Sequence, residues 1–394
     1  MAQKINLVVH RDPRIRAIFF QITIPILVVY GLYLLLQNAF NNLEERGIRT
    51  SFDFLDTIAP FAVGFSPFLE FKLGESTYWQ VFFIGIQNTI LVAILGIIAA
   101  TLLGFIIGVM RLSPNLLISR FATVYIEILR NIPLLLQIFF WNFAVFLVIL
   151  PPVRESYSLF ETVFLNQRGL YLPKATINNE TGFLILCAIV IAGIVGAIFL
   201  RRWAYKRHDE TGQLFPARLV GVLGVFVLAI LGFFALGGPI TFELPQLGRF
   251  NFSGGFELPL PMFSLWFALT TYTSAFIAEN VRAGIQSVPK GQTEAAQAVG
   301  LSRAKMLQKV IIPQAMRVII PPTISQYLNL TKNSSLAVAV AYEEIVAIFM
   351  GIALNQTGQA VTIIIMTMAV YITLSLLTSL ILNLYNNSVQ LVER

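Results

Sequence analysis

The chain has 394 residues, of which 57% are hydrophobic and only 12% are charged, and its mean hydropathy is +0.77. A soluble domain carries roughly twice that charged fraction, so the composition excludes a soluble protein. The formal net charge of +7 is therefore interpreted through the positions of Lys and Arg around membrane segments, and not as a nucleic-acid-binding surface.

Apolar segments long enough to cross the ~30 Å hydrocarbon core of a bilayer as helices recur along the chain. We place eight of them near residues 17–40, 84–110, 122–150, 182–200, 217–237, 263–284, 317–341 and 359–384. The first is longer than the apolar core of a signal peptide, and no short A-x-A-like cleavage site follows it, so we do not expect it to be a cleavable signal peptide. The predicted fold class is an all-α, multi-pass membrane protein with about eight transmembrane helices.

The Lys and Arg residues are distributed unequally between alternate loops. One set of loops holds 18 of the 27 residues, and the opposite set holds 7 although its loops are longer. Because cytoplasmic loops are enriched in Lys and Arg, we assign the richer set to the cytoplasm. Both chain ends, and the polar segment between the sixth and seventh apolar segments, are then predicted to face the cytoplasm.

The outward-facing loops are residues 41–83, 151–181 and 238–261. The first mixes acidic and aromatic residues, which suits a position along the membrane surface. The other two are rich in Pro, Gly and Asn and are interpreted as loops. None is long enough to form a globular domain with its own core.

The polar cytoplasmic segment predicts two short helices joined at a glycine. Pro289 suits the first turn of a helix because its missing N–H is not needed there. Glu294, Ala295 and Ala296 are helix formers, and the two alanines are small enough for another surface to approach closely. Gly300 is the expected C-terminal cap, because glycine enters the left-handed region without a steric penalty.

A second helix is expected to start after Ser302, whose side chain suits an N-cap, and to run through Lys309 before ending ahead of Pro313. The whole segment would then lie along the membrane face as helix, glycine elbow and helix. On physical grounds alone, an ordinary amphipathic loop between two spans explains it equally well.

The spacing of these residues resembles the EAA loop of ABC-importer permeases, which has the form E-A-A, three residues, G, nine residues, I-x-L-P. The chain has Glu294–Ala296, then Gly300, then Val310–Pro313. Val replaces the first Ile and Ile replaces Leu, which are conservative changes. The resemblance implies an ATPase-coupling socket formed by Glu294, Ala295, Ala296, Gly300 and Pro313.

Four blocks of sequence resemble the polar amino-acid branch of these permeases. They are residues 79–115, 125–137, 272–292 and 330–337. Typical members have five spans and begin near Trp79, whereas this chain has an extra N-terminal span and an insert with two further spans. The arrangement looks like that of the larger permeases of general L-amino-acid uptake systems, and it implies a type I importer core with both chain ends in the cytoplasm.

The resemblance divides the chain into four regions. Residues 1–78 are the extra N-terminal span and a periplasmic loop, and residues 79–150 are the first part of the permease core. Residues 151–261 are the insert with two extra spans. Residues 262–394 are the second part of the core, with the EAA loop at 289–313.

Ionisable residues within membrane spans are costly and are treated as functional hypotheses. Lys332 lies about three helical turns beyond Pro322, near the expected midplane of the bilayer. Its ammonium group suits the carboxylate of an amino acid. We group four polar residues with it as candidate substrate-binding residues: Asn333, Ser334, Ser335 and Tyr272. Alternatively, Lys332 pairs with Glu127 or another acid and only holds helices together.

Two pairs of opposite charges have the i, i+3 spacing of one helical face. Glu127 and Arg130 either neutralise each other inside the membrane or act as a gate beside a kink at Pro133. Glu279 and Arg282 lie near the cytoplasmic end of their span, where a structural or interface pair is expected.

No G-x-x-x-x-G-K-[ST] segment occurs, so the chain does not cradle ATP phosphates by that motif. We expect no catalytic, cofactor-binding or metal-binding residues in it. The resemblance implies ATP and Mg²⁺ on two partner ATPase subunits, together with a second, related but different permease chain and a periplasmic amino-acid-binding protein. The predicted location is the bacterial inner membrane, and nucleic acid is not an expected partner.

The expected function is ATP-driven uptake of L-amino acids by alternating access. Two other function classes stay open. An ion-coupled secondary carrier would use Glu127, Lys332 or Glu279 for proton or sodium coupling and would need no ATPase. A receptor or scaffold would carry out no transport.

Overall fold

The computed structural model of the protein describes residues 13–45 and 50–389. The chain divides into two compact units, residues 1–130 with 270–394, and residues 131–269. Five cations that entered the topology prediction lie outside the described residues: Lys4, Arg11, Arg46, Arg49 and Arg394. The cytoplasmic location of both chain ends therefore stays a prediction.

Six helices of the described chain are long and apolar enough to cross a membrane. They are α1 (Pro13–Glu45), α2 (Tyr78–Arg111), α6 (Glu180–Thr211), α7 (Ala217–Ala235), α8 (Leu260–Gln286) and α13 (Ala360–Val389). Each coincides with one of the predicted apolar segments, because a helix satisfies every backbone hydrogen bond within the segment.

The prediction of a single helix at 122–150 is wrong. The chain instead forms α3 (Leu116–Asn131), α4 (Leu134–Phe139), the π-helical segment η3 (Phe140–Phe146) and α5 (Leu147–Ile149). The break lies at Pro133, which lacks an N–H and disfavours a helical conformation at the preceding Ile132.

The predicted segment at 317–341 has a different form from a single span. Helix α11 (Ile312–Asn333) begins earlier and changes at Ser334 into the 3₁₀ helix η6 (Ser334–Val340). Ala341 then has a φ of +58°. A short apolar segment that was not predicted follows, formed by the π-helix η7 (Val346–Ala353) and α12 (Leu354–Thr357).

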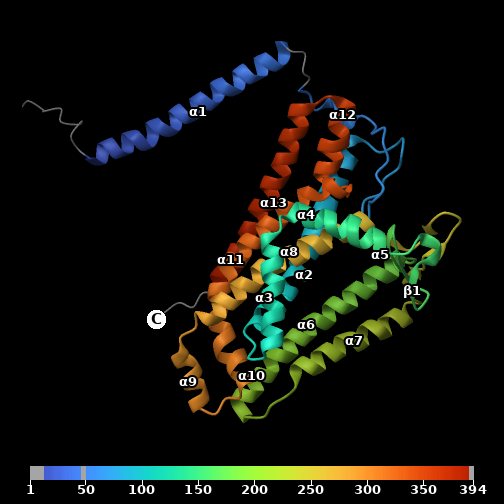
Figure 1. Ribbon diagram of the computed structural model, residues 1–394. Helices are drawn as coiled ribbons and strands as arrows, with labels where there is room; N and C mark the ends of the chain where they lie inside the picture. Colours follow the sequence, from blue (N-terminus) through green and yellow to red (C-terminus); the bar gives the residue numbers. More distant parts are fainter. Residues whose placement is uncertain (1–12, 46–49, 390–394) are drawn as a thin grey trace, which may run out of the picture. The chain divides into compact units, whose positions relative to one another are not determined.

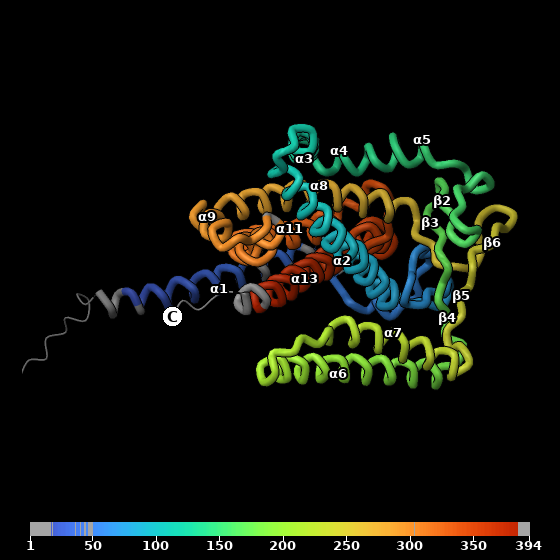
Figure 2. The backbone as a smooth tube through the Cα atoms, turned by 90° about the horizontal axis from the view of Figure 1, so that it is seen from below, coloured from blue at the N-terminus to red at the C-terminus, as the bar shows by residue number. Residues whose placement is uncertain are grey.

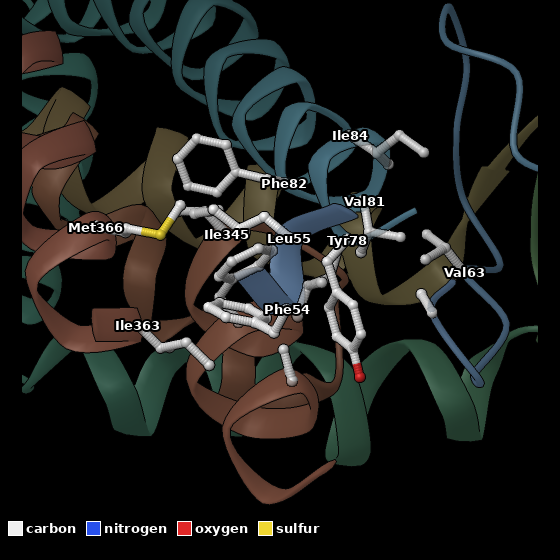
Figure 3. Close-up of a cluster of buried hydrophobic side chains, with 14 of the residues drawn as sticks. Phe54, Leu55, Val63, Tyr78, Val81, Phe82, Ile84, Ile345, Ile363 and Met366 are labelled. Atoms are coloured by element: carbon white, nitrogen blue, oxygen red, sulfur yellow. The ribbon is translucent and has the colours of Figure 1, made fainter. Parts of the chain in front are cut away.

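The first unit is built around α2, α11 and α13, which lie side by side (Figure 2). At one end of α2, the 3₁₀ helix η2 (Asp53–Asp56) inserts Phe54 and Leu55 between Tyr78 of α2 and Ile345 (Figure 3). Leu55 and Ile345 are fully buried. The segment that follows α1 therefore contributes to the core of this unit, although the sequence suited a surface position.

Two glycines bring α2 and α8 into close contact. A Cβ atom on Gly104 would lie 2.7 Å from the Cβ of Ile277, and one on Gly108 would lie 2.7 Å from the carbonyl oxygen of Ala278. Any larger side chain at these positions would push the helices apart. The G-x-x-x-G pattern permits this kind of approach between membrane helices.

The second unit contains a hairpin of α6 and α7 (Figure 1) and several short strands. The strands are β1 (Tyr157–Leu159), β2 (Val163–Asn166), β3 (Gly169–Leu172), β4 (Lys174–Ile177), β5 (Ile240–Glu243), β6 (Gln246–Leu247), β7 (Phe252–Ser253) and β8 (Phe256–Pro259), preceded by the 3₁₀ helix η4 (Val153–Glu155). One four-stranded sheet has the order β1-β2-β3-β8, while β4 pairs with β5 and β6 with β7.

The mostly helical fold agrees with the predicted class, but the expectation of irregular loops at 151–181 and 238–261 is wrong, because both form short strands. The hairpin of α6 and α7 returns the chain, so that β3 pairs with β8 and β4 with β5, both antiparallel. Strands β1, β2 and β3 pair within the first loop and β6 pairs with β7 within the second, and the two loops also supply partners for each other's backbone groups through β8 and β5.

A buried tyrosine stands at the centre of this sheet. Tyr171 is 1% exposed, and its hydroxyl lies 2.9 Å from Oδ1 of Asn251 and 3.1 Å from Oε1 of Glu257. Burial, followed by the neighbouring Glu257 carboxylate, raises the pKa of Tyr171 to about 12. The hydroxyl therefore stays protonated at neutral pH and serves as a hydrogen-bond donor.

Gly104→Leu is expected to destabilise the protein by about 1–3 kcal/mol, because the added side chain must displace α8. Gly196→Leu is the matched control, since a Cβ at Gly196 on α6 meets nothing within 4 Å. Thermal unfolding of both variants in detergent, followed by size-exclusion chromatography, measures the difference. Equal unfolding temperatures would show that α2 and α8 are not closely packed.

Candidate functional site

The polar segment that follows α8 begins with a glycine-capped helix. Helix α9 (Lys290–Ala298) has its C-cap at Val299, and the next residue, Gly300, has a φ of +74°. The N–H of Gly300 donates to the carbonyl of Gln297 at 2.9 Å, and the N–H of Leu301 donates to the carbonyl of Ala296 at 3.1 Å. This pair of bonds is the Schellman arrangement, so the predicted role of Gly300 as a helix cap is confirmed.

The second part of the segment is more continuous than predicted. Helix α10 (Arg303–Met306) directly follows Ser302, continues as the π-helix η5 (Leu307–Ile311) and leads into α11. Pro313 lies in the first turn of α11, so the prediction that the helical structure stops ahead of Pro313 is wrong. A proline is tolerated there because the first N–H groups of a helix have no partner within the helix.

Helix α9 has one anchored side and one free side. Ala296 is 4% exposed and packs in a small cluster with Met306 and Ile311. Glu294 and Ala295 are exposed on the same helix. The segment therefore holds α9 through Ala296 and leaves Glu294 and Ala295 exposed.

A side-chain hydrogen bond and a groove lie between α9 and the rest of the first unit. The side chain of Gln314 on α11 donates to that of Gln292 on α9 at 3.1 Å. Beside them, a groove of about 520 Å³ runs between the end of α2 and the segment, lined among others by Met110, Ile285 and Met306.

A cluster of charges joins the ends of α2, α3 and α8. The carboxylate of Glu279 accepts hydrogen bonds from Nε of Arg282 at 3.0 Å and from Nη2 of Arg282 at 2.5 Å, so the predicted pair on α8 is confirmed. It also accepts a bond from Arg111 at the end of α2. A second guanidinium nitrogen of Arg111 lies 3.7 Å from Oε1 of Glu127 on α3.

The predicted pair of Glu127 and Arg130 is not formed. Glu127 is instead next to Arg111, and the guanidinium of Arg130 lies 5.1 Å from the ring centre of Phe276. Spacing along one helix allowed the pair, but α2 and α8 supply closer partners for both groups.

The residues around Lys332 lie where α11 changes into η6. Lys332 is exposed and forms no ion pair within the described chain, so the alternative in which it pairs with Glu127 is not observed. The buried hydroxyl of Ser334 donates to the carbonyl of Thr331 at 2.7 Å, and that of Ser335 donates to the carbonyl of Lys332 at 2.8 Å. Asn333 is half-buried.

Tyr272 lies on α8, and its ring is 4.9 Å from that of Phe276. It is half-buried, and no hydrogen bond links it to Lys332 in the described part of the chain. Tyr272 is thus grouped with Arg130 around Phe276, whereas Lys332 and its three neighbours lie at the end of α11.

Sequence reasoning missed a buried acidic residue between η6 and η7. Glu344 is fully buried, and its carboxyl group accepts hydrogen bonds from the N–H of Val346 at 3.0 Å and that of Ala347 at 2.9 Å. The hydroxyl of Tyr371 on α13 donates to it at 2.8 Å, and the hydroxyl of Thr89 on α2 lies 3.4 Å away.

The neighbouring Glu343 binds a different segment. Its side chain accepts a hydrogen bond from the N–H of Phe65 at 2.9 Å. The amide of Asn88 on α2 donates to the carbonyls of both Phe65 and Glu343, at 2.9 and 2.7 Å. The sequence did contain a signal for these residues, namely two adjacent acids between apolar segments. Ionisable residues within apolar segments are treated as functional hypotheses, and this applies to Glu343 and Glu344 as it does to Lys332.

Comparisons with known proteins find similar sequences over most of the chain. A family model described as a binding-protein-dependent transport system inner membrane component matches residues 212–391. The putative amino-acid ABC transporter permease protein YhdX of Escherichia coli K12 is 46% identical over 383 residues, which cover 97% of this chain and 96% of that protein.

Two further relatives are similar over nearly their full length. The general L-amino acid transport system permease protein AapQ of Rhizobium johnstonii is 45% identical over 97% of this chain and 94% of its own. The glutamate/glutamine/aspartate/asparagine transport system permease protein BztB of Rhodobacter capsulatus is 38% identical over 97% of this chain and 96% of its own. The matches to these relatives each cover 97% of this chain and so extend well beyond residues 212–391, which the family model matches.

Glu344→Leu is expected to destabilise the first unit by about 3 kcal/mol or more, because it leaves several buried donors without an acceptor. Glu343→Leu is the neighbouring control and should cost less, since that residue is only half-buried. Thermal unfolding in detergent compares the two. If the variant at 344 is as stable as the unmodified chain, the carboxyl group does not hold these segments together.

Proposed function

This chain belongs to the amino-acid ABC transporter permeases, a family of binding-protein-dependent inner-membrane components. On this basis, we propose how it couples ATP hydrolysis to transport. The chain is the permease component of an amino-acid ABC importer, and ATP is hydrolysed on separate subunits. The alternative of an ion-coupled carrier that works without an ATPase is not supported by these relatives.

In this proposal, both chain ends and residues 289–313 face the cytoplasm, and an ATPase subunit docks on α9. The two-sided character of α9 carries the proposal, since Glu294 and Ala295 are free for a partner while Ala296 is anchored. The unequal distribution of Lys and Arg supports the orientation. Gly300 and Pro313 shape the socket by capping α9 and starting α11.

Movement of α9 would reach the core by two routes. Through Ala296 and the bond between Gln292 and Gln314, it would displace α11, at whose far end Lys332 lies. Through the chain it would displace α8, which is tied to α2 by Glu279 and Arg111. A rigid-body displacement of these helices relative to a second permease would open the path to one side and close it to the other. In this scheme the gate residues are Glu127, which belongs to the moving charge cluster, and Arg130, which follows it on α3.

The proposed cargo is L-amino acids, in keeping with relatives that are named for general L-amino acid transport and for glutamate, glutamine, aspartate and asparagine. The exposed, unpaired ammonium of Lys332 suits the carboxylate that all these compounds share. Asn333, Ser335 and Tyr272 are the half-buried polar residues proposed to complete the site, and Ser334 supports the turn beneath it.

ABC importers of this family work with other permease, ATPase and binding-protein subunits. We propose one related but different permease chain, two ATPase subunits that bind ATP and Mg²⁺, and one periplasmic amino-acid-binding protein, all assembled at a bacterial inner membrane. No part of the mechanism requires a cofactor, metal or catalytic residue in this chain.

Glu294→Arg is expected to lower ATP-driven uptake at least about tenfold, because a reversed charge on the free face of α9 repels the docked ATPase. The matched control is Glu210→Arg, the same exchange at an exposed position of α6. Uptake into proteoliposomes and co-purification of the ATPase are measured together. Unchanged values for both in the variant at 294 would exclude α9 as the docking site.

Lys332→Met is expected to reduce uptake about tenfold or to change the range of amino acids carried, because the carboxylate loses its charged partner. Lys332→Arg keeps the charge and should retain part of the activity, while Lys174→Met on β4 should behave as the unmodified protein. A competition panel of acidic, neutral and basic amino acids provides the measurement. Normal transport of all of them by the methionine variant would restrict Lys332 to a structural role.

A further inference from the structure

The hairpin of α6 and α7 carries an apolar groove that none of the proposed steps of transport uses. Its volume is about 590 Å³, which lies within the range of ordinary ligand sites. Its lining residues recur at intervals of three and four on both helices, so the groove follows one face of each helix. It runs from the apolar middle of the hairpin to its charged end.

Small residues create the groove. A Cβ atom on Gly221 of α7 would lie 3.0 Å from the Cβ of Ala197 on α6, so the helices touch at this level and leave a valley beside the contact. Val222 and Phe226 form its wall and are 70% and 64% exposed. Such a valley suits a flexible hydrocarbon chain, which fills an irregular apolar surface without polar partners.

Two arginines from different helices meet at the end of the groove. Arg201 of α6 and Arg218 of α7 both line it, and they also line the adjoining cavity under the turn that joins the helices. The hydroxyl of Tyr205 lies 3.5 Å from Nη2 of Arg201 and also interacts with Arg218. Neither arginine forms an ion pair within the described chain.

Aromatic residues mark this end of the hairpin as the membrane interface. Trp203 and Tyr205 are 47% and 54% exposed on α6, directly beside the arginines. Trp and Tyr collect at the level of the lipid head groups. A position of this end at the interface would place the two guanidinium groups at the level of the lipid phosphates, with the groove extending toward the hydrocarbon core.

We propose that this groove binds one anionic phospholipid, with an acyl chain along α6 and α7 and the phosphate between Arg201 and Arg218. The ligand must be amphipathic, because the groove is apolar along its length and cationic at its end. A free phosphate would leave the groove empty, and an apolar helix of a partner would leave two guanidinium groups buried without a counter-charge. Basic pockets between membrane helices bind anionic head groups in this way.

The proposal predicts selective retention of phosphatidylglycerol over phosphatidylcholine. The intact transporter is purified in detergent, exposed to equal amounts of the two lipids and measured by native mass spectrometry. In the double variant R201A/R218A, binding of phosphatidylglycerol should be roughly 30-fold weaker, since each cation near the head group contributes about 1 kcal/mol. If the double variant fails to assemble, Arg201→Gln alone should give roughly a fivefold loss.

Arg207→Ala is the matched control for charge. It removes the same charge from the same helix, but its guanidinium lies 5.3 Å from the ring centre of Trp203, bonds to Gln213 at 2.9 Å and does not line the groove. Its retention of phosphatidylglycerol should equal that of the unmodified transporter. An equal loss in Arg207→Ala and in the double variant would overturn the site.

A second arm tests the groove without changing any charge. Val222→Trp fills it and should reduce retention of phosphatidylglycerol at least about fivefold, whereas Val222→Ala leaves it open and should not. If the tryptophan variant retains as much lipid as the alanine variant, the groove holds no acyl chain. Equal retention of the two lipids by the unmodified transporter, or displacement by inorganic phosphate alone, would also overturn the proposal.

Discussion

The helical core depends on one buried carboxyl group, that of Glu344. A polar group in apolar surroundings is tolerated only when it is hydrogen-bonded, and this one takes its partners from three segments. The N–H groups of Val346 and Ala347 belong to the start of η7, Tyr371 belongs to α13, and Thr89 belongs to α2. The carboxyl group is satisfied only when all three segments are in place, so it fixes both the start of η7 and the position of α13 along α2.

Helix α2 is held at both ends and along its length, which makes it suited to move as a rigid body. Near its beginning, Asn88 binds the carbonyls of Phe65 and Glu343. In its second half, Gly104 and Gly108 allow α8 to approach until backbone and side chains touch, and at its end Arg111 binds Glu279 of α8. In the proposed mechanism, a displacement of α8 would carry α2 with it, because closely packed helices resist independent deformation. Helix α9, which follows α8 after a short turn, is the element from which such a displacement would start.

The unit at 131–269 is organised by the hairpin of α6 and α7. Its two loops are rich in turn-forming residues and show no clear strand pattern in the sequence. They nevertheless pair with each other, because α6 and α7 form a hairpin that brings them together. Tyr171 then becomes the centre of a small sheet core. At the other end of the same hairpin, the helices touch at Ala197 and Gly221, and the groove beside this contact ends at Arg201 and Arg218. One hairpin thus creates both the sheet and the proposed lipid site.

The sequence by itself determined the membrane character, six of the long helices, the glycine cap at Gly300 and the pair of Glu279 with Arg282, because each follows from composition or from spacing along one element. It also indicated the family, since the motif around Glu294 is a local pattern that is recognised without knowing which segments pack against it. Only the tertiary structure decided which groups meet across elements. Spacing suggested Arg130 as the partner of Glu127, but Arg111 occupies that position from α2. The same limit hid the contacts of Glu344 with Thr89 and Tyr371 and the pairing of the two outer loops, because these partners come from segments far away in the chain.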